Sequence, residues 1–367
     1  MATIEAGRER FRAALRDYQR AAGGFLTGAG LWLLIGLFFV WAFFQHRDAL
    51  VTGLVTGSVF ALGAIGITLI YGILKFGHFA HGDSMMLSAY LAFFLVSGVI
   101  VGERQDTQAL PVNLGDLPGA GERIWEFSFG YGLLLAMAAA AVIMAGVFIA
   151  LDRAVYRPLR RRRSGIVIFS IASLGLALVI RSLMLIFWGA DPRSYTRGFR
   201  SSFDLLGTRV LYDQLFIFCM AMLLMAAVYL LLYRTKLGKA MRAMADNPDL
   251  ARISGINTEQ IVLWTWGVAG ALVAVAGVML ALQAQLKPEI GFIVLLPLFA
   301  AAIVGGIGSP HGALLGGLIV GAVQEVAVST DFPLLGEVSP GYKFSIAFIV
   351  LIVILLVRPR GLFGAKQ

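Results

Sequence analysis

Ten long apolar stretches alternate with short polar segments along this chain. They cover residues 25–44, 50–74, 84–101, 129–151, 165–188, 211–233, 259–283, 292–307, 312–330 and 342–357. A helix needs about 20 apolar residues to cross the hydrocarbon core of a bilayer, and most of these stretches come near that length. The pattern therefore predicts an all-α, polytopic helical membrane protein with about ten spans. Several stretches are short or rich in glycine, so we expect some broken or re-entrant helices.

The composition agrees with a chain that shares its core with lipid. Of the 367 residues, 59% are hydrophobic and only 14% are charged, whereas soluble domains are about one-quarter charged. The formal net charge of +9 could indicate nucleic-acid binding, but the basic residues cluster beside the apolar stretches. The positive-inside rule of membrane proteins explains that placement more simply. The single cysteine, Cys219, has no partner in the chain for a disulfide.

The basic clusters predict an orientation. The densest one is Arg153, Arg157 and Arg160–Arg163, which we place on the cytoplasmic side. Counting spans from this cluster puts both termini and residues 234–258 on the same side, and the acidic loop 102–128 outside. One loop disagrees with the count, because residues 189–210 fall outside yet have a basic excess. Its arginines are Arg193, Arg197, Arg200 and Arg209.

The chain divides into two parts. Residues 1–24 contain five arginines and form an N-terminal extension, expected to be cytoplasmic, with an amphipathic surface helix as the simplest interpretation. Residues 25–364 form the transmembrane domain.

One polar segment, residues 234–258, contains helix signals but is too polar to cross a membrane. Asn247 can cap a short helix whose first residue is Pro248, and Gly255 can end it. Such a cytoplasmic helical hook is how a membrane channel without its own ATPase can be held by one. We therefore expect a coupling helix within 234–258.

Glycine and ionisable residues inside the apolar stretches are candidates for a translocation path. Small residues let helices approach closely, and they also permit unwound backbone that can line an aqueous route. Packing alone is the simpler interpretation of any single glycine. Buried ionisable groups are costly in a membrane and often pair or line a pathway. The candidate path residues are Gly57, His81, Asp83, Arg181, Gly306, Gly308 and Glu325.

His78 and His81 do not make a convincing metal site, because the sequence offers no further His/Cys cluster as ligands. We expect instead a bend at this point, with Asp83 or Ser84 capping the next helix. For Arg181, a pathway role and snorkelling to the interface stay open, and Glu325 favours a buried contact between helices.

No catalytic or phosphate-binding motif is present. Gly238-Lys239 is followed by Ala240 and lacks the upstream glycine of a phosphate loop, and the chain has no Gly-x-Ser-x-Gly elbow. The chain is therefore not expected to be an enzyme or to bind a cofactor. Any ATP and Mg²⁺ that drive transport must be bound by partner subunits.

Residues 50–364 resemble the branched-chain amino acid ABC transporter permeases, specifically the LivH-like half of the pair. Three stretches carry the resemblance: residues 53–90 with Phe79-Ala-His-Gly-Asp83, residues 233–257, and Gly305–Gly317 with the ending Arg358-Pro-Arg-Gly-Leu-Phe363. His78 stands where the family usually has Asn. In the second stretch, the residues that match the family's coupling helix are Gly238, Ala240, Arg242, Ala243, Pro248, Ala251 and Gly255.

The resemblance implies a type II-like importer permease with glycine-rich broken helices in the bacterial cytoplasmic (inner) membrane. It implies four kinds of partner: a LivM-like second permease, two ABC ATPase subunits, a periplasmic amino-acid-binding protein and the lipid bilayer. No nucleic-acid partner is expected. The implied mechanism is alternating access driven by ATP, with branched-chain or other hydrophobic amino acids as substrates. A urea or short-chain amide permease and an ion-coupled secondary transporter remain the alternatives.

Overall fold

The computed structural model describes residues 29–101, 106–195, 200–205, 207–332 and 336–363. The N-terminal extension predicted at residues 1–24 lies outside the described residues.

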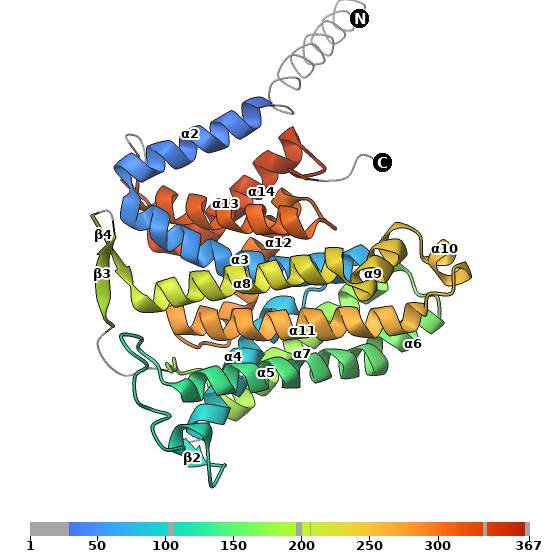
Figure 1. Cartoon of the computed structure of the whole chain (residues 1–367), viewed down its shortest axis with the longest axis horizontal. Coiled ribbons are helices and arrows are strands. Elements are labelled where there is room, and N and C mark those ends of the chain that lie inside the picture. Colours follow the sequence, from blue (N-terminus) through green and yellow to red (C-terminus); the bar gives the residue numbers. More distant parts are fainter. Residues whose placement is uncertain (1–28, 102–105, 196–199, 206, 333–335, 364–367) are drawn as a thin grey trace, which may run out of the picture.

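Each of the ten apolar stretches contains a helix (Figure 1). The helices are α2 (Ala29–Gln45), α3 (Arg47–Leu74), α4 (His81–Ser97), α5 (Tyr131–Leu151), α7 (Ile166–Trp188), α8 (Tyr212–Arg234), α11 (Thr258–Gln283), α12 (Ile290–Gly305), α13 (Pro310–Ser329) and α14 (Lys343–Val357). Within the described ranges, seven helical stretches are long and apolar enough to cross a membrane, and Gly30–Gln45 and Ile290–Gly305 are shorter apolar helices. The predicted helical membrane fold is confirmed, whereas the number of complete spans stays a prediction.

The connections contain short elements. A π-helical turn (Asp152–Tyr156) and α6 (Arg157–Arg161) extend α5, and α9 (Lys236–Asp246) and α10 (Pro248–Ile253) follow α8. Three small antiparallel hairpins lie in the loops: β1 (Val99–Val101) with β2 (Asp106–Gln108), β3 (Ser202–Leu205) with β4 (Thr208–Leu211), and β5 (Asp331–Phe332) with β6 (Gly336–Glu337). The 3₁₀ turns are Leu114–Asp116 and Pro340–Tyr342.

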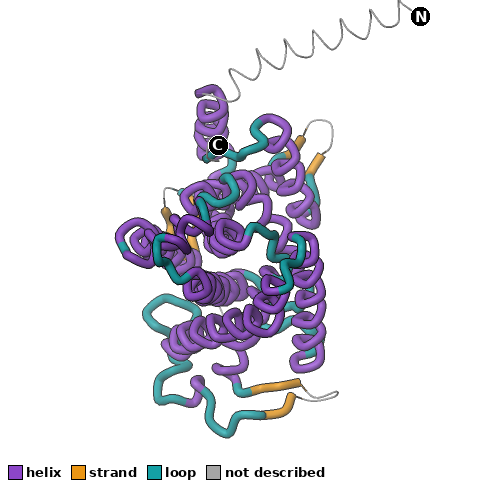
Figure 2. Tube along the Cα trace, turned by 90° about the vertical axis from the view of Figure 1, so that its right-hand side faces the viewer, coloured by secondary structure: helices purple, strands orange, loops and turns teal. Residues whose placement is uncertain are grey.

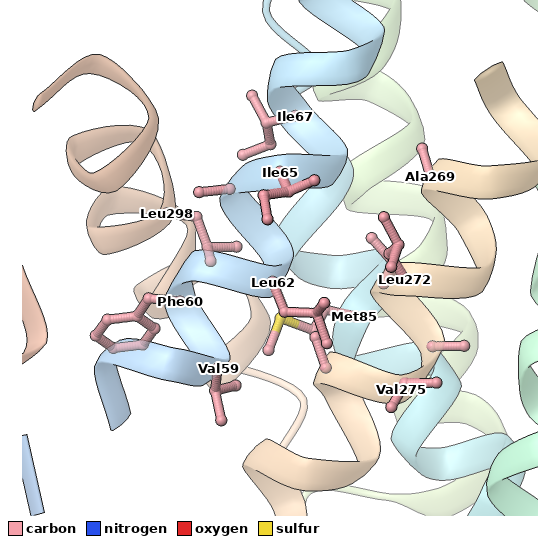
Figure 3. Close-up of a cluster of buried hydrophobic side chains, with 14 of the residues drawn as sticks. Val59, Phe60, Leu62, Ile65, Ile67, Met85, Ala269, Leu272, Val275 and Leu298 are labelled. Atoms are coloured by element: carbon pink, nitrogen blue, oxygen red, sulfur yellow. The ribbon is translucent and has the colours of Figure 1, made fainter. Parts of the chain in front are cut away.

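Helix α3 lies at the centre of the bundle and is apolar on every side, as expected for a helix enclosed by others. It packs against α4, α8, α11, α12 and α13, and it runs between α13 and α8 in Figure 1. Figure 2 shows the same bundle turned by 90°, with most of its helices seen nearly end-on. Figure 3 shows Phe60 and Ile65 of α3 near Leu298 of α12, and Leu62 facing Leu272 of α11. This core fixes α3 as the element against which the other helices are positioned.

A glycine seam joins α3 to α13. A Cβ atom placed on Gly321 would lie 2.3 Å from the Cα of Gly57, and one on Gly57 would lie 2.7 Å from the carbonyl oxygen of Gly317. Side chains cannot occupy that space, so the two backbones touch directly, as small residues allow in membrane helices. Gly57 therefore has a packing role at this seam.

Helices α4 and α12 begin inside the bundle rather than at its end. The His81 imidazole Nε2 lies 2.9 Å from the carbonyl oxygen of Gly63, near the middle of α3. The first turns of α4 and α12 touch, because a Cβ on Gly82 would lie 2.1 Å from the Gly291 carbonyl oxygen. The glycine-rich sequence thus permits a crossing of two helix starts at mid-depth.

The cap predicted for α4 is wrong. The helix already begins at His81 after Ala80, with no side-chain cap, so Asp83 lies within the first turn. Its carboxylate is fully buried and binds the Arg181 guanidinium of α7, with Nε and Nη2 each 3.0 Å from Oδ1. Leaving a buried carboxylate without a charged partner costs more free energy than leaving a helix without a side-chain cap. The ion pair also shows that the Arg181 side chain points to Asp83 inside the protein and does not snorkel to the membrane interface.

One arginine of the basic loop 189–210 is used in contacts inside the protein. The Arg200 side chain donates to the carbonyl oxygens of Leu282 and Gln283 at the end of α11, at 2.9 and 3.4 Å, and lies 3.8 Å from the Asp213 carboxylate. Cations stabilise helix C-termini by binding their free carbonyl groups. Basic residues that are used in this way carry little information about membrane orientation.

Candidate functional site

Three cavities lie along α3, with volumes of about 600, 450 and 220 Å³, and both α8 and α13 contribute side chains to each of them. The second and third share lining residues, whereas the first shares none with them; the row of three is called the groove. We call them the vestibule, which includes Thr52, Thr56 and Phe60, the apolar cavity, which includes Ile65, and the α9 cavity, which includes Thr68, Leu69 and Gly72. Cavities at successive levels along a membrane bundle are positions that a transport route can connect.

The vestibule is the polar end of the groove. Its wall holds two ion pairs, Arg200 with Asp213 and Lys343 with Glu325, the latter at 2.6 Å. The Gln283 amide nitrogen donates to the Thr56 hydroxyl at 2.8 Å, while its buried carbonyl oxygen has no hydrogen-bond partner among the described residues. An acceptor left without a partner here is available to a ligand's N–H group or to water.

The apolar cavity forms the middle of the groove. Its wall is almost entirely aliphatic, thioether and aromatic: Ile65, Met222, Met225, Ala226, Val228, Leu232, Leu314 and Leu315, closed at one end by Tyr229, Tyr233, Pro310 and His311. Flexible methionine side chains adapt to ligands of different shape. This section favours an apolar group over a charged one.

The α9 cavity joins the groove to the polar segment after α8. Leu232, Tyr233 and Pro310 line both this cavity and the apolar cavity, so the two are adjacent. Its remaining wall includes Met241, Arg242 and Ala245 of α9 and Gly308 of the α12–α13 turn. The groove therefore ends on the segment that the sequence singles out as a coupling element.

The local structure of this segment follows its sequence closely. The Thr235 hydroxyl caps α9 by accepting the Gly238 N–H at 3.0 Å. Asn247 caps α10 through the N–H groups of residues 249 and 250, Pro248 is the first residue of α10, and Gly255 follows its end with a φ of +85°. The predicted capping residues of α10 are confirmed.

The predicted coupling residues divide by environment. Gly238 and Ala251 are buried within the chain, Ala240 and Ala243 are half-buried, and Pro248 and Gly255 are exposed. Arg242 is exposed but lies against the groove, with its guanidinium carbon 4.7 Å from the centre of the Tyr233 ring. Sequence reasoning missed two exposed apolar side chains on α10, Leu250 and Ile253, which are 60% and 83% accessible.

The candidate path residues fall into two groups, those that line a cavity and those that do not. Among the described residues, Glu325 lines the vestibule and Gly308 lines the α9 cavity, whereas Gly57, His81, Asp83, Arg181 and Gly306 line none of the three cavities. Gly306 instead packs against Gly361 at the C-terminal end of the chain. No group of three or more metal-ligating residues comes together in the part of the chain that the structure describes.

Comparison with known proteins assigns the chain to a family. A family model described as branched-chain amino acid transport system / permease component matches residues 49–355. The chain belongs to this family.

Individual relatives agree with the family match over nearly their whole length. The permease protein BraD of the high-affinity branched-chain amino acid transport system of Pseudomonas aeruginosa is 32% identical, over 88% of this chain and 97% of the relative. The LivH permease of Escherichia coli K12 is 28% identical over 89% and 97%, and a probable LivH of Methanocaldococcus jannaschii is 28% identical over 85% and 90%. The chain is thus a multi-pass permease component, and the predicted resemblance is confirmed.

Several groove residues of this family member could not be found from the sequence. Met222, Tyr229 and Tyr233 of α8 and His311 of α13 belong to apolar stretches or to a glycine-rich turn that looks structural. The only available signal was the spacing of Tyr229 and Tyr233, which places both rings on one face of a helix.

Proposed function

We propose that the chain is one of two permease subunits of a binding-protein-dependent ABC importer for branched-chain or other hydrophobic amino acids. The groove along α3, apolar in the middle, polar at its vestibule and ending on α9, is the observation that carries the proposal. It forms this chain's half of the route, in a bacterial cytoplasmic membrane.

The α9 end of the groove is the cytoplasmic end in this proposal. The basic cluster Arg157–Arg163 and the basic residues of α9 support that orientation through the positive-inside rule. The start of α2 lies near the C-terminal end of the chain, with the Trp32 and Phe363 rings 5.4 Å apart. This proximity supports placing both ends of the membrane domain on one side.

A second permease subunit of the LivM-like kind supplies the other wall of the route. The groove is open on one side, where Met222 and Tyr229 are 37% and 48% accessible. A solute that is to be kept from lipid needs these side chains to be covered, and two-fold arrangements are the usual way to enclose a path between subunits.

ABC ATPase subunits are the proposed partners of α9 and α10, with ATP and Mg²⁺ bound by those subunits. Leu250 and Ile253 leave an exposed apolar surface on a segment that is otherwise polar, as interaction sites do. In the proposed cycle, ATP-driven closure of the ATPase dimer moves this segment and changes which end of the groove is open. A periplasmic amino-acid-binding protein delivers the solute to the vestibule.

The lining of the groove supports an aliphatic amino acid as the solute. The vestibule is the polar part of the groove, which suits the charged end of an amino acid, and the apolar cavity suits its aliphatic side chain. Urea and short amides have no comparable apolar part. Glu325 is paired with Lys343, which argues against a role as the coupling carboxylate of an ion-driven transporter.

Uptake measurements test this function. The gene for this chain is deleted in its native host. Uptake of radiolabelled leucine at micromolar concentration is then compared between the deletion strain, the parent strain and the complemented strain. We expect uptake to fall in the deletion strain, to return on complementation, and to need the neighbouring ATPase genes. Undiminished leucine, isoleucine and valine uptake in the deletion strain would contradict the proposed substrate class.

The Gly238→Ala substitution is expected to lower leucine uptake by about fivefold or more while the protein still inserts. A Cβ at this position would lie 2.2 Å from the Leu231 carbonyl oxygen and 2.3 Å from that of Leu232, so α9 must move away from the end of α8. Such overpacking costs about 1–3 kcal/mol in the free energy of the native α8–α9 arrangement. A cost of about 1 kcal/mol corresponds to about a fivefold change in the population of that arrangement, and uptake should fall with it. Uptake and membrane content are measured together.

Gly175→Ala is the matched control for Gly238→Ala, because a Cβ on Gly175 of α7 would meet nothing within 4 Å. It should transport like the unmodified protein. Equal uptake by the two variants would show that the angle between α8 and α9 does not matter for transport.

A further inference from the structure

An aromatic cluster lines the apolar cavity, and one of its members also lines the adjacent α9 cavity. The Tyr229 and Tyr233 rings stack with centroids 4.8 Å apart, and the His311 ring lies 5.1 and 4.9 Å from them. The Tyr233 hydroxyl is 3.5 Å from His311 Nδ1. The cluster thus bridges α8 and α13, the two walls of the groove.

Tyr233 occupies the position where the two cavities meet. It lines both of them, and its neighbours Leu232 and Pro310 do the same. A solute that crosses this shared wall from the apolar cavity to the α9 cavity passes beside the Tyr233 ring. A side-chain rotation at this one residue can widen or narrow the passage, since an aromatic ring turns as a unit.

Arg242 connects this ring to α9. Its guanidinium carbon lies 4.7 Å from the Tyr233 ring centre, which is a cation–π contact. Tyr233 is also the last residue but one of α8, two positions before the Thr235 cap of α9. A displacement of α9 therefore changes both the contact on the ring and the backbone next to it.

We propose that Tyr229, Tyr233 and His311 form a gate between the apolar cavity and the α9 cavity. In this proposal Arg242 transmits a movement of α9 to the Tyr233 ring and so sets the position of that ring. This inference rests on the proposed function, because it takes the groove as the route of the solute. It gives Arg242 a role inside the permease, in place of the contact with an ATPase that the sequence resemblance alone implies.

Thiol labelling tests the gate without depending on which solute is carried. Met222, in the apolar cavity, is replaced by cysteine in a Cys219→Ser background, and the whole transporter is studied in inside-out membrane vesicles. A membrane-impermeant maleimide is added on the α9 side, with and without ATP and vanadate. The rate of labelling at position 222 reports how open the gate is.

Three variants are compared. Tyr233→Ala removes the contacts with Tyr229 and His311 and should raise the labelling rate about tenfold, which corresponds to the loss of two aromatic contacts. Arg242→Gln should leave the ring in place but reduce the effect of ATP on labelling severalfold, because the cation–π contact with α9 is lost. Leu230→Ala is the control, since this residue of α8 is 54% accessible and does not line the groove.

The gate is overturned if Tyr233→Ala and Leu230→Ala label at the same rate. The positioning role of Arg242 is overturned if Arg242→Gln responds to ATP like the unmodified protein. Failure of the proposed function has a different signature, namely no ATP-dependent leucine uptake by the unmodified transporter.

Discussion

Replacing Arg181 by methionine is expected to destabilise the folded protein by about 3–5 kcal/mol, because it leaves a buried carboxylate without its counter-charge. The Asp83 side chain is fully inaccessible, and the Arg181 guanidinium is its ion-pair partner. No bulk water reaches this carboxylate to replace the lost partner. The pair ties α7 to the point where α4 and α12 begin, so the loss spreads to three helices.

Removing the charge of Asp83 instead should lower the free energy of unfolding by a smaller amount. Asp83→Asn leaves the Arg181 side chain 22% accessible and 4.8 Å from the centre of the Phe292 ring, where it keeps a cation–π contact. We expect a loss of about 1–3 kcal/mol, typical of a hydrogen bond to a charged group. The double variant Asp83→Asn/Arg181→Met should be more stable than Arg181→Met alone, since neither charge remains.

Unfolding of the four proteins in mixed micelles gives the coupling energy of a double-mutant cycle. A coupling near zero, or an Arg181→Met variant as stable as Asp83→Asn, would show that the pair is not what stabilises this crossing. Insertion is checked separately by the amount of protein in the membrane fraction.

Gly321→Val should prevent the bundle from closing, with a loss of at least about 3 kcal/mol, at the upper end of overpacking effects. The first atom of any side chain there would lie 2.3 Å from Gly57 Cα and 2.5 Å from the Gly53 carbonyl oxygen. Backbone atoms cannot rotate aside as a flexible side chain can. Helices α3 and α13 would have to separate, and both walls of the groove depend on their contact.

The control for Gly321→Val is Gly146→Val, because the space beside Gly146 on α5 is open to 4 Å. Size-exclusion chromatography and thermal unfolding in detergent compare the two. We expect Gly146→Val to give a single sharp peak and Gly321→Val to aggregate or to yield little folded protein. Equal behaviour would mean that the glycine seam is not a tight contact in the protein.

The apolar pattern was sufficient to predict where the helices lie, because burial in lipid requires long apolar stretches whatever their neighbours. The caps of α10 were also predictable, since Asn247, Pro248 and Gly255 act on their own backbone. Local interactions of this kind depend only on residues that are close in the sequence, so the sequence alone predicts them.

The ion-pair partner of Asp83 was not predictable from the sequence, because Arg181 is 98 positions away. The two residues meet only because α4 and α7 pack against each other in the folded bundle. The same holds for the contact of Arg242 with Tyr233 and for the groove itself, which is formed by α3, α8 and α13 together. Residues of the apolar cavity look like ordinary membrane-helix residues in sequence. What distinguishes them is the absence of a neighbour on one side.

The most direct test of the account is whether α10 touches an ATPase in the native membrane. A tagged chain with Cys219→Ser and Ile253→Cys is cross-linked with a short thiol-reactive reagent, purified in mild detergent and identified by mass spectrometry. A Val112→Cys variant, exposed in the loop before α5, serves as the control. We expect a second permease subunit in the complex and an ATPase subunit linked to position 253 but not to position 112. Recovery of the chain alone, with no ATPase linked at position 253, would contradict it.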